Sequence, residues 1–509
     1  MKNACLRDSG SEAMTNSPST AEPSVNRPLE TYQIVGRILG PAVFVAMLAT
    51  DQWQDVMNPQ AWRAAAVGLW MAIWWATEAI PVPVTAFLPL VIFEPLGITT
   101  IRDAAAPYAN PVIYLFLGGF MMALALERWN LHRRIALAIL DRTGTDGRRL
   151  IGGFMLVCAM LSMWMTNTST TMMLLPIVLS VIAVVRENIP ELSEKSQTDF
   201  QIAMLLGLAY SASIGGLATL VGTPPNALLI GYLAENYGIE ISFAQWMRVG
   251  IPVTLVMLPI AWIALTRFLH PVNIPASDAV NNHLRELREE MGPITTPERR
   301  VAVIFALVIT SWMLRRPLTE FLGISGVSDA GIVMTAGVLL FMIPSGNPAQ
   351  PQLMTWQYAT RLPWGVLILF GGGLSLAAAV SNTGLALWLG ESLAPLNAWG
   401  IAVLVVAAVA LVIFLTELTS NLATTATLLP VMGAIAIQAG IPPIFLTVPI
   451  TIAASCAFML PVATPPNAIV FATGQLTIPQ MVRAGLFLNL TGIVIVTIIA
   501  LYVAPNALV

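Results

Sequence analysis

Two short polar clusters interrupt long apolar stretches of this 509-residue sequence. Asn167 begins the segment NTSTTMMLLP and Asn421 begins NLATTATLLP, and the Asn, Thr-Thr and Leu-Leu-Pro residues of the two segments coincide. Amide and hydroxyl donors at the first turn of a helix, together with the positive end of its dipole, can hold a carboxylate. Neither cluster contains Lys or Arg. The clusters therefore predict an anion site built from neutral donors.

A second pair of motifs breaks the helical pattern. The sequence GTPPNA occupies residues 222–227, and ATPPNA occupies residues 463–468. Two consecutive prolines remove two backbone donors and clash with the preceding turn, so the helix must unwind and leave carbonyl groups free. Irregular backbone at membrane depth is tolerated only where it is buried in protein or lines a cavity, and its carbonyls are natural ligands for Na⁺. These breaks therefore predict sodium sites.

The spacing of these motifs indicates an internal duplication. The Asn/Thr clusters are 421 − 167 = 254 residues apart, and Gly118 falls on Gly372 at the same shift. The Thr-Pro-Pro-Asn breaks are 464 − 223 = 241 residues apart. A lone polar cluster in a membrane helix usually serves interhelical hydrogen bonding, but that role does not explain why both motifs recur in the same order. We therefore expect two inverted repeats with a binding site between them.

The elements that position these motifs must be membrane helices. Hydrophobic residues make up 57% of the chain and charged residues 10%, and the mean hydropathy is +0.77. Apolar windows near the ~20 residues of a spanning helix recur along the chain, without the alternating pattern of outer-membrane strands. We therefore expect an all-α polytopic membrane protein in a lipid bilayer. The formal charge of −3 argues against a nucleic-acid partner.

Polar segments divide the chain into parts. Residues 1–31 are rich in Ser, Asn and Pro, lack the pattern of a signal peptide, and are predicted to be a disordered cytoplasmic tail. Residues 32–269 form the first half, and residues 301–509 form the second half. The linker between them, residues 270–300, contains HLRELREEMGPITTPERR and is either an amphipathic interfacial segment or a solvated helix. Its basic residues predict that it faces the cytoplasm.

Other reactive residues give weaker signals. The three cysteines show no CxxC spacing and the three histidines form no HExxH-like pair, so neither a disulfide framework nor a metal centre is expected. The sequence has no GxxxxGK[ST] loop, which argues against a self-contained ATP-driven pump. Glu78 and Glu417 lie in apolar stretches, where an ionisable group suggests a proton carrier. For Glu417, a helix-packing or capping role is an equal alternative.

At these residues the sequence resembles the divalent anion:sodium symporter family of sodium-coupled di- and tricarboxylate transporters. The similarity runs from WWATEAIPVPVTAFLPL, which begins at Trp74, through both Asn/Thr clusters to the second Thr-Pro-Pro-Asn break. The resemblance implies about eleven transmembrane helices, two re-entrant hairpins, and a scaffold and a transport domain in each protomer of a homodimer. It also implies an elevator-type movement in a cell (inner) membrane and Na⁺-coupled symport of C4-dicarboxylates such as succinate, malate and fumarate.

The resemblance carries site residues onto this chain in three sets. The first sodium site is expected to use Ser162, Thr166, Asn167 and the backbone at Gly222. The second is expected to use Thr416, Thr419, Asn421 and the backbone at Ala463. Substrate carboxylates are expected to meet Asn167, Thr168, Thr223, Pro224, Asn421, Thr464 and Pro465.

Two positions depart from the family signature of Ser-Asn-Thr at the hairpin tips. Thr166 replaces the first Ser and keeps a hydroxyl, whereas Leu422 replaces the Thr of the second signature and removes a hydroxyl donor. This second change suggests relaxed selection at one end of the substrate. Among transporters, sodium-coupled sulfate uptake and sodium-independent dicarboxylate exchange are the alternatives. An enzyme is not expected, because no nucleophile and base pair and no metal site occurs at membrane depth.

Overall fold

The computed structural model describes residues 30–188, 192–323, 325–393 and 400–508. Most of the predicted tail, residues 1–29, therefore lies outside the described residues. Helices dominate the described part, and its only strands are the antiparallel pair β1 (Pro344–Asn347) and β2 (Gln350–Gln352). The prediction of an all-α fold is confirmed.

The first half begins with helices that lead up to the first Asn/Thr cluster and continues through the first Pro-Pro break. Its elements are α1 (Thr31–Thr50), α2 (Pro59–Thr77), α3 (Val82–Thr85), α4 (Leu88–Ile92), α5 (Ile101–Ala105), η1 (Ala106–Ala109), α6 (Pro111–Arg128), α7 (Leu131–Thr143), α8 (Gly147–Ser162), α9 (Asn167–Asn188), α10 (Glu194–Gly216), α11 (Pro224–Tyr237), α12 (Phe243–Ile263) and the π-helical turn η2 (Ala264–Leu269).

The second half repeats the later part of this order after a linker helix. Its elements are α13 (Asp278–Glu289), α14 (Thr296–Leu322), α15 (Asp329–Met342), α16 (Trp356–Ala359), α17 (Trp364–Asn382), α18 (Leu385–Leu393), α19 (Ile401–Thr416), α20 (Asn421–Gln438), α21 (Ile444–Ala454), α22 (Pro465–Phe471), α23 (Ile478–Tyr502) and α24 (Ala504–Leu508).

Seven helical segments of the described chain are long and apolar enough to cross a bilayer. Four shorter apolar helical segments accompany them: Val82–Ile92, Asp329–Met342, Ile401–Thr416 and Ile444–Ala454. Two of these, α19 and α21, run into the second Asn/Thr cluster and the second Pro-Pro break, where a full-length helix is not expected. The polytopic membrane architecture is confirmed, and the number of eleven crossings stays a prediction.

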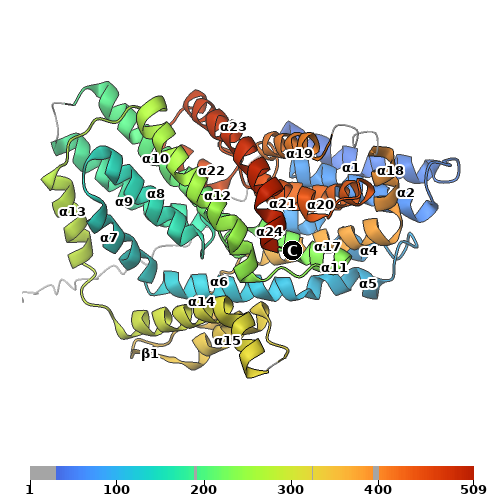
Figure 1. Ribbon diagram of the computed structural model, residues 1–509, viewed down its shortest axis with the longest axis horizontal. Coiled ribbons are helices and arrows are strands. Elements are labelled where there is room, and N and C mark those ends of the chain that lie inside the picture. The colour runs from blue at the N-terminus through green and yellow to red at the C-terminus, as the bar shows by residue number, and fades with distance from the viewer. Residues whose placement is uncertain (1–29, 189–191, 324, 394–399, 509) are drawn as a thin grey trace, which may run out of the picture.

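Figure 1 shows how the helices are arranged along the long axis of the molecule. Helices α7 to α10 and α13 lie at one end, and α1, α2 and α18 lie at the other. Helices α14 and α15 run along one long side, where α15 packs against α6. The linker helix α13 buries Val280 and Leu284 and packs on α7 and α9, so its apolar face is covered by protein.

Close helix packing explains the two matching glycines, Gly118 and Gly372. A Cβ atom on Gly118 of α6 would meet the Val333 side chain of α15 at 2.6 Å. A Cβ atom on Gly372 of α17 would meet the Ala86 carbonyl oxygen at 2.5 Å. Real Cβ contacts are not this short, so both glycines are needed for helix packing. Glu78 ends α2 in a left-handed conformation and is exposed, so the structure gives no support for a proton carrier buried in the protein at this position.

Candidate functional site

The first Asn/Thr cluster lies where two antiparallel helices meet. Helix α8 ends at Ser162, the chain turns over residues 163–166, and α9 begins at Asn167. The Ser162 hydroxyl oxygen lies 2.6 Å from Oδ1 of Asn167 and 2.7 Å from the carbonyl oxygen of Ala212 on α10. We call residues 163–166 the first tip. A short helix–turn–helix thus places Ser162 and Asn167 beside the C-terminal end of α10.

The second Asn/Thr cluster repeats this arrangement. Helix α19 ends at Thr416, the chain turns over residues 417–420, which we call the second tip, and α20 begins at Asn421. The Thr416 hydroxyl oxygen lies 2.8 Å from Oδ1 of Asn421 and 2.9 Å from the carbonyl oxygen of Ala454 on α21. In each half, three oxygen atoms meet around a single hydroxyl hydrogen, so with the amide in this orientation one oxygen pair lacks a hydrogen between its members. A cation can complete such a cluster.

The two Pro-Pro breaks form matching loops. The first loop, residues 217–223, joins α10 to α11, and the second loop, residues 455–464, joins α21 to α22. Nδ2 of Asn226 donates to the carbonyl of Thr219 at 2.8 Å, and Nδ2 of Asn467 donates to the carbonyl of Leu460 at 3.0 Å. The positions match at the shift 467 − 226 = 460 − 219 = 241. The asparagine of each break therefore fixes its own loop.

The first loop touches the first Asn/Thr cluster. A Cβ atom on Gly216 would lie 2.6 Å from Oδ1 of Asn167 and 3.1 Å from the carbonyl oxygen of Gly222. Both oxygens therefore face the same small space beside Gly216. Of the predicted first sodium set, the structure brings together Ser162, Asn167 and Gly222. The Thr166 hydroxyl instead accepts from the backbone N–H of Ser169 at 3.2 Å and so caps α9.

The second sodium set is placed in a similar way. Thr416 and Asn421 are in contact, and Ala463 is buried in the second loop with its N–H donating to the carbonyl of Leu460 at 3.2 Å. The Thr419 hydroxyl lies 3.0 Å from the Leu415 carbonyl and 2.6 Å from the Thr424 hydroxyl. Thr419 thus uses its side chain within the hairpin.

A further helix packs closely against each loop, α12 against the first loop and α23 against the second. A Cβ atom on Gly250 of α12 would lie 2.4 Å from the carbonyl oxygen of Leu217, and one on Gly485 of α23 would lie 2.3 Å from that of Phe458. The glycines match at 485 − 250 = 235 and the loop residues at 458 − 217 = 241. This third correspondence extends the duplication to α12 and α23. Sequence reasoning missed it, although the similar capping boxes of Ser242 and Thr477, 477 − 242 = 235 residues apart, were a signal.

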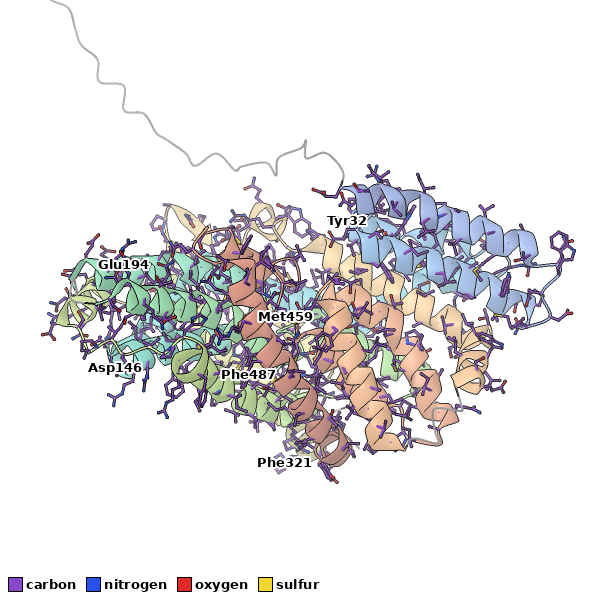
Figure 2. The ribbon with its side chains drawn as sticks, turned by 90° about the horizontal axis from the view of Figure 1, so that it is seen from above. Tyr32, Asp146, Glu194, Phe321, Met459 and Phe487 are labelled. Carbon is purple, nitrogen blue, oxygen red and sulfur yellow. The ribbon has the colours of Figure 1, made fainter. Side chains whose placement is uncertain are left out.

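The two halves meet at their broken helices. The hydroxyl oxygens of Thr223 and Ser455 lie 3.4 Å apart, and both residues are buried. The Tyr210 ring of α10 packs edge-on against Phe458 of the second loop at 5.3 Å. Figure 2 shows Met459 of this loop near the middle of the molecule, between Asp146 and Glu194 at one end and Tyr32 at the other side. The candidate site is therefore central.

The predicted substrate residues surround this junction. Asn167 and Asn421 are partly exposed, and Nδ2 of each has no hydrogen-bond partner among the described residues. Thr168 is also partly exposed. Pro224 and Pro465 begin α11 and α22 after Thr223 and Thr464, both of which are buried.

Glu417 has a role that the sequence left open. It directly follows Thr416, is only 3% exposed, and receives backbone N–H groups from the second loop. No local pattern could reveal this contact, because the donors lie about forty residues further along the chain. The intramembrane position of the carboxylate was the only signal.

An aromatic stack attaches the first tip to α14. Trp164 lies at ring-centroid distances of 5.9 Å from Phe243 and 5.3 Å from Phe305, and Phe243 stacks on Trp312 at 4.0 Å. Phe305 and Trp312 belong to α14, so the stack joins the first hairpin to a helix outside it. The equivalent residue of the second tip, at 164 + 254 = 418, is Leu418, which is 69% exposed.

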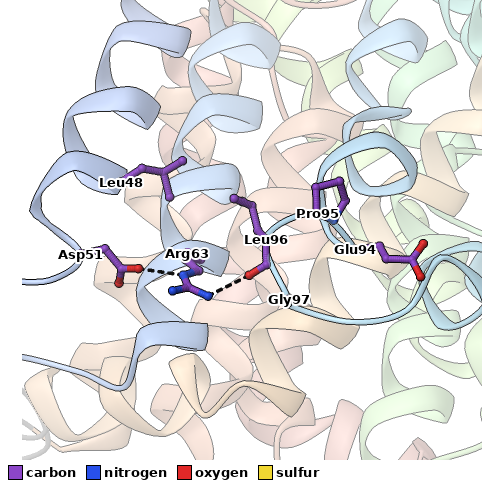
Figure 3. Close-up of a pocket in the computed structure, with 7 residues that line it drawn as sticks. All are labelled: Leu48, Asp51, Arg63, Glu94, Pro95, Leu96 and Gly97. Atoms are coloured by element: carbon purple, nitrogen blue, oxygen red, sulfur yellow. Dashed lines mark hydrogen bonds and ion pairs between the residues drawn. The ribbon is translucent and has the colours of Figure 1, made fainter.

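A surface pocket lies away from this junction (Figure 3). Asp51 and Arg63 form an ion pair there at 2.8 Å, and Arg63 also donates to the carbonyl of Leu96 at 3.0 Å. The charges of Asp51 and Arg63 thus compensate each other. None of the predicted ligands lines it; its residues are Leu48, Asp51, Arg63, Glu94, Pro95, Leu96 and Gly97.

Comparison with known proteins shows to which family the chain belongs. Residues 32–507 match the family model of the sodium:sulfate symporter transmembrane region. The chain belongs to this family. The predicted membership among the divalent anion:sodium symporters is therefore confirmed, and the matched range contains both tips and both loops.

Similar members of the symporter family are bacterial transporters. The sodium-dependent dicarboxylate transporter SdcS of Staphylococcus saprophyticus is 39% identical over 486 residues, which cover 95% of this chain and 93% of the relative. SdcS of Staphylococcus aureus strain MRSA252 is 40% identical over 492 residues, with the same coverage. The Alcanivorax borkumensis YdaH transporter has a similar fold, with a TM-score of 0.56 over 86% of this chain at 15% identity.

Proposed function

We propose that this protein is a secondary transporter that couples the entry of Na⁺ to symport of C4-dicarboxylates such as succinate, malate and fumarate. Its place is the cell membrane of a bacterium, and the ion gradient rather than a chemical reaction supplies the energy. The names of the SdcS relatives support sodium and dicarboxylate as the transported species. The choice of C4 substrates rests on the resemblance to the sodium-coupled di- and tricarboxylate transporters.

One observation carries the proposal: the pair of oxygen clusters at Ser162 and Thr416. Each cluster places a hydroxyl, an amide oxygen and a backbone carbonyl within 2.6–2.9 Å contacts around one hydrogen. Uncharged oxygens of this kind suit Na⁺, which needs no transition-metal ligands. The described residues contain no group of His, Cys, Asp and Glu side chains that could hold another metal. Two Na⁺ ions per cycle follow from two clusters.

The anion is expected to bind where the two Asn side chains present their Nδ2 groups. Oδ1 of Asn167 and of Asn421 faces a hydroxyl, so the amide nitrogen of each is left for a carboxylate. The side chain of Ser420 makes no capping hydrogen bond, which leaves first-turn N–H groups of α20 available to an anion. A dicarboxylate can thus bridge the halves, with each amide joining one sodium to one carboxylate.

Uptake into proteoliposomes tests this function. We expect concentrative succinate uptake with an inward Na⁺ gradient, and none when K⁺ or choline replaces Na⁺. Malate and fumarate are expected to compete, whereas sulfate competes weakly. Uptake that ignores Na⁺ and follows a counter-gradient of dicarboxylate would instead identify an exchanger, and uptake of sulfate in preference to succinate would identify a sulfate symporter.

The proposal includes an elevator-type movement of α8–α12 and α19–α23 against the remaining helices, in each protomer of a homodimer. Asn110 caps α6, one of the helices that stay in place, and its Nδ2 donates to Glu235 of α11 at 3.2 Å. This bond must break when α11 moves. Cysteines at these two positions, in a background without native cysteines, should stop uptake when they are cross-linked and restore it on reduction. Continued uptake by the cross-linked protein would exclude this movement.

The homodimer is tested separately. Light scattering of the purified protein should give the mass of a dimer.

A further inference from the structure

The Glu417 carboxyl group accepts four hydrogen bonds from the second loop and α23. Its Oε1 accepts the N–H groups of Phe458 at 2.8 Å and Met459 at 2.9 Å, and its Oε2 accepts the N–H of Leu460 at 3.0 Å. Nδ2 of Asn489 on α23 donates to Oε1 at 2.7 Å. Four donors therefore point at one carboxyl group, and both oxygens act as acceptors. Among the described residues, four donors and no acceptor face the group, which is the arrangement that a carboxylate requires.

The carboxylate has no cationic partner among the described residues. None of the ion pairs between described residues includes Glu417, and the side chain is 3% exposed. A buried charge is stable only when it is compensated by hydrogen bonds and an opposite charge. The residue before it, Thr416, belongs to the oxygen cluster in which Na⁺ is proposed to bind. A sodium ion in this cluster would supply the missing positive charge.

Glu417 also connects to the predicted backbone ligand. It holds the N–H of Leu460, and the Leu460 carbonyl accepts both the N–H of Ala463 at 3.2 Å and Nδ2 of Asn467 at 3.0 Å. The direction of the second loop, and with it the carbonyl of Ala463, therefore depends on the carboxylate. Removing the charge would loosen the loop that leads to the ion.

The first half has no such charge. The residue equivalent to Glu417, at 417 − 254 = 163, is Met163, whose backbone carbonyl accepts the Thr219 hydroxyl of the first loop. The residue equivalent to Asn489, at 489 − 235 = 254, is Thr254, whose hydroxyl donates to the carbonyl of Ile214 at 3.0 Å. The first loop is thus held by neutral hydrogen bonds alone. The two sodium clusters differ by one unit of fixed charge.

We propose that Glu417 is a positioning residue for the second sodium cluster, and that its charge makes this cluster bind Na⁺ more tightly than the first. The inference rests on the proposed function, because it assumes that Na⁺ binds at both clusters. Hydrogen bonds to a charged group and the loss of a nearby charge each change affinity by about tenfold or more. The tighter cluster fills first and orders the second loop before the substrate binds.

The test measures Na⁺ affinity in the purified protein, apart from transport. Glu417→Gln keeps the shape of the side chain but replaces one acceptor oxygen by a donor. We expect the Na⁺ concentration that gives half of the Na⁺-dependent thermal stabilisation to rise at least about tenfold, with choline as the salt control. The half-saturating Na⁺ for succinate uptake should rise in parallel, while the succinate KM at saturating Na⁺ changes by less than about threefold.

Two further variants separate positioning from folding. Asn489→Leu removes one donor and keeps the carboxylate, so Na⁺ affinity should fall by about threefold to tenfold. Met163→Leu, at the equivalent position of the first half, should leave Na⁺ affinity within about twofold, because only the Met163 backbone makes the contact. If Glu417→Gln does not fold, Asn489→Leu decides the question.

The outcomes separate this inference from the proposed function. An unchanged Na⁺ affinity in Glu417→Gln, or in Asn489→Leu when the first variant is unfolded, overturns the role of Glu417 even if uptake is lost. A wild-type protein that shows neither Na⁺-dependent stabilisation nor Na⁺-dependent uptake overturns the proposed function itself.

Discussion

The two halves of the molecule have matching hairpins and loops, but different contacts hold these hairpins and loops in place. Both place a hydroxyl and an asparagine at a hairpin tip, and both use the asparagine of a Thr-Pro-Pro-Asn break to hold a loop. The first tip packs Trp164 against α14, whereas the second tip leaves Leu418 exposed. The second loop is held by a carboxylate, and the first loop is not.

This difference separates the contacts that form the site from those that adjust it. A contact present in both halves is required by the chemistry that both halves share, namely an ion cluster next to an amide donor. A contact present in one half gives that half its own affinity, mobility or selectivity. Substitutions at shared positions should therefore have similar effects in both halves, and those at unshared positions should have unequal effects.

The largest effect is expected at the shared asparagines. Asn167→Ala and Asn421→Ala each remove an amide that contacts the hydroxyl of its ion cluster and offers a donor to the substrate. Losing hydrogen bonds to an ion and to a carboxylate costs about 3 kcal/mol or more, so succinate uptake should fall about a hundredfold in both variants. Size-exclusion chromatography serves as the control for folding. Normal uptake by either folded variant would contradict the site assignment.

The next largest effect is expected at Gly216, because the two ion clusters differ in the free space beside them. Gly216→Ala would put a methyl group 2.6 Å from Oδ1 of Asn167, whereas the equivalent residue of the second half, at 216 + 241 = 457, is already Ala457. Such crowding costs about 1–3 kcal/mol, and the half-saturating Na⁺ for uptake should rise tenfold or more. Ala457→Gly is the matched change and should have a much smaller effect. Equal effects would show that the space beside Gly216 holds no ion.

The sequence revealed most of the shared motifs, although not the matching glycines Gly250 and Gly485, and it missed most of the unshared contacts. The Asn/Thr clusters and the Pro-Pro breaks recur in order, so their duplication alone pointed to a central site. The carboxylate contact of Glu417 joins residues 41 positions apart, and the stack of Trp164 joins residues at least 79 positions apart. Neither has a counterpart in the other half, and therefore no repetition could mark it. Such contacts depend on how the helices pack, which local pattern does not determine.

A smaller effect should separate the two tips. Trp164→Ala removes contacts with Phe243 and Phe305, and aromatic pairs of this geometry contribute about 0.5–1.5 kcal/mol each beyond their buried area. We expect a lower midpoint of thermal unfolding in detergent, equivalent to about 1–2 kcal/mol. Leu418→Ala, at the exposed equivalent position, should change stability by less than about 0.5 kcal/mol. A similar loss in both variants would mean that the stack does not fasten the first tip.

The smallest effect concerns Leu422, the residue that follows Asn421 in the first turn of α20. It is 6% exposed, so a hydroxyl placed there must find a partner, which is either the substrate or a carbonyl of its own chain. Leu422→Thr restores the family signature. If the new hydroxyl reaches the substrate, the affinity for succinate should increase by the ~0.5–1.5 kcal/mol of one hydrogen bond, or up to about tenfold.

Leu422→Val is the control for this last prediction, because Val has the shape of Thr without the hydroxyl. The inhibition constants of succinate and sulfate should be measured in the wild type and in both variants. A site that hydrogen-bonds a substrate oxygen discriminates more strongly than an apolar wall, so Leu422→Thr alone should favour succinate and weaken competition by sulfate. An equal change in Leu422→Val would assign the effect to lost volume. No change in either variant would place residue 422 away from the substrate, and the second half would then bind its carboxylate through Asn421 without help from its neighbour.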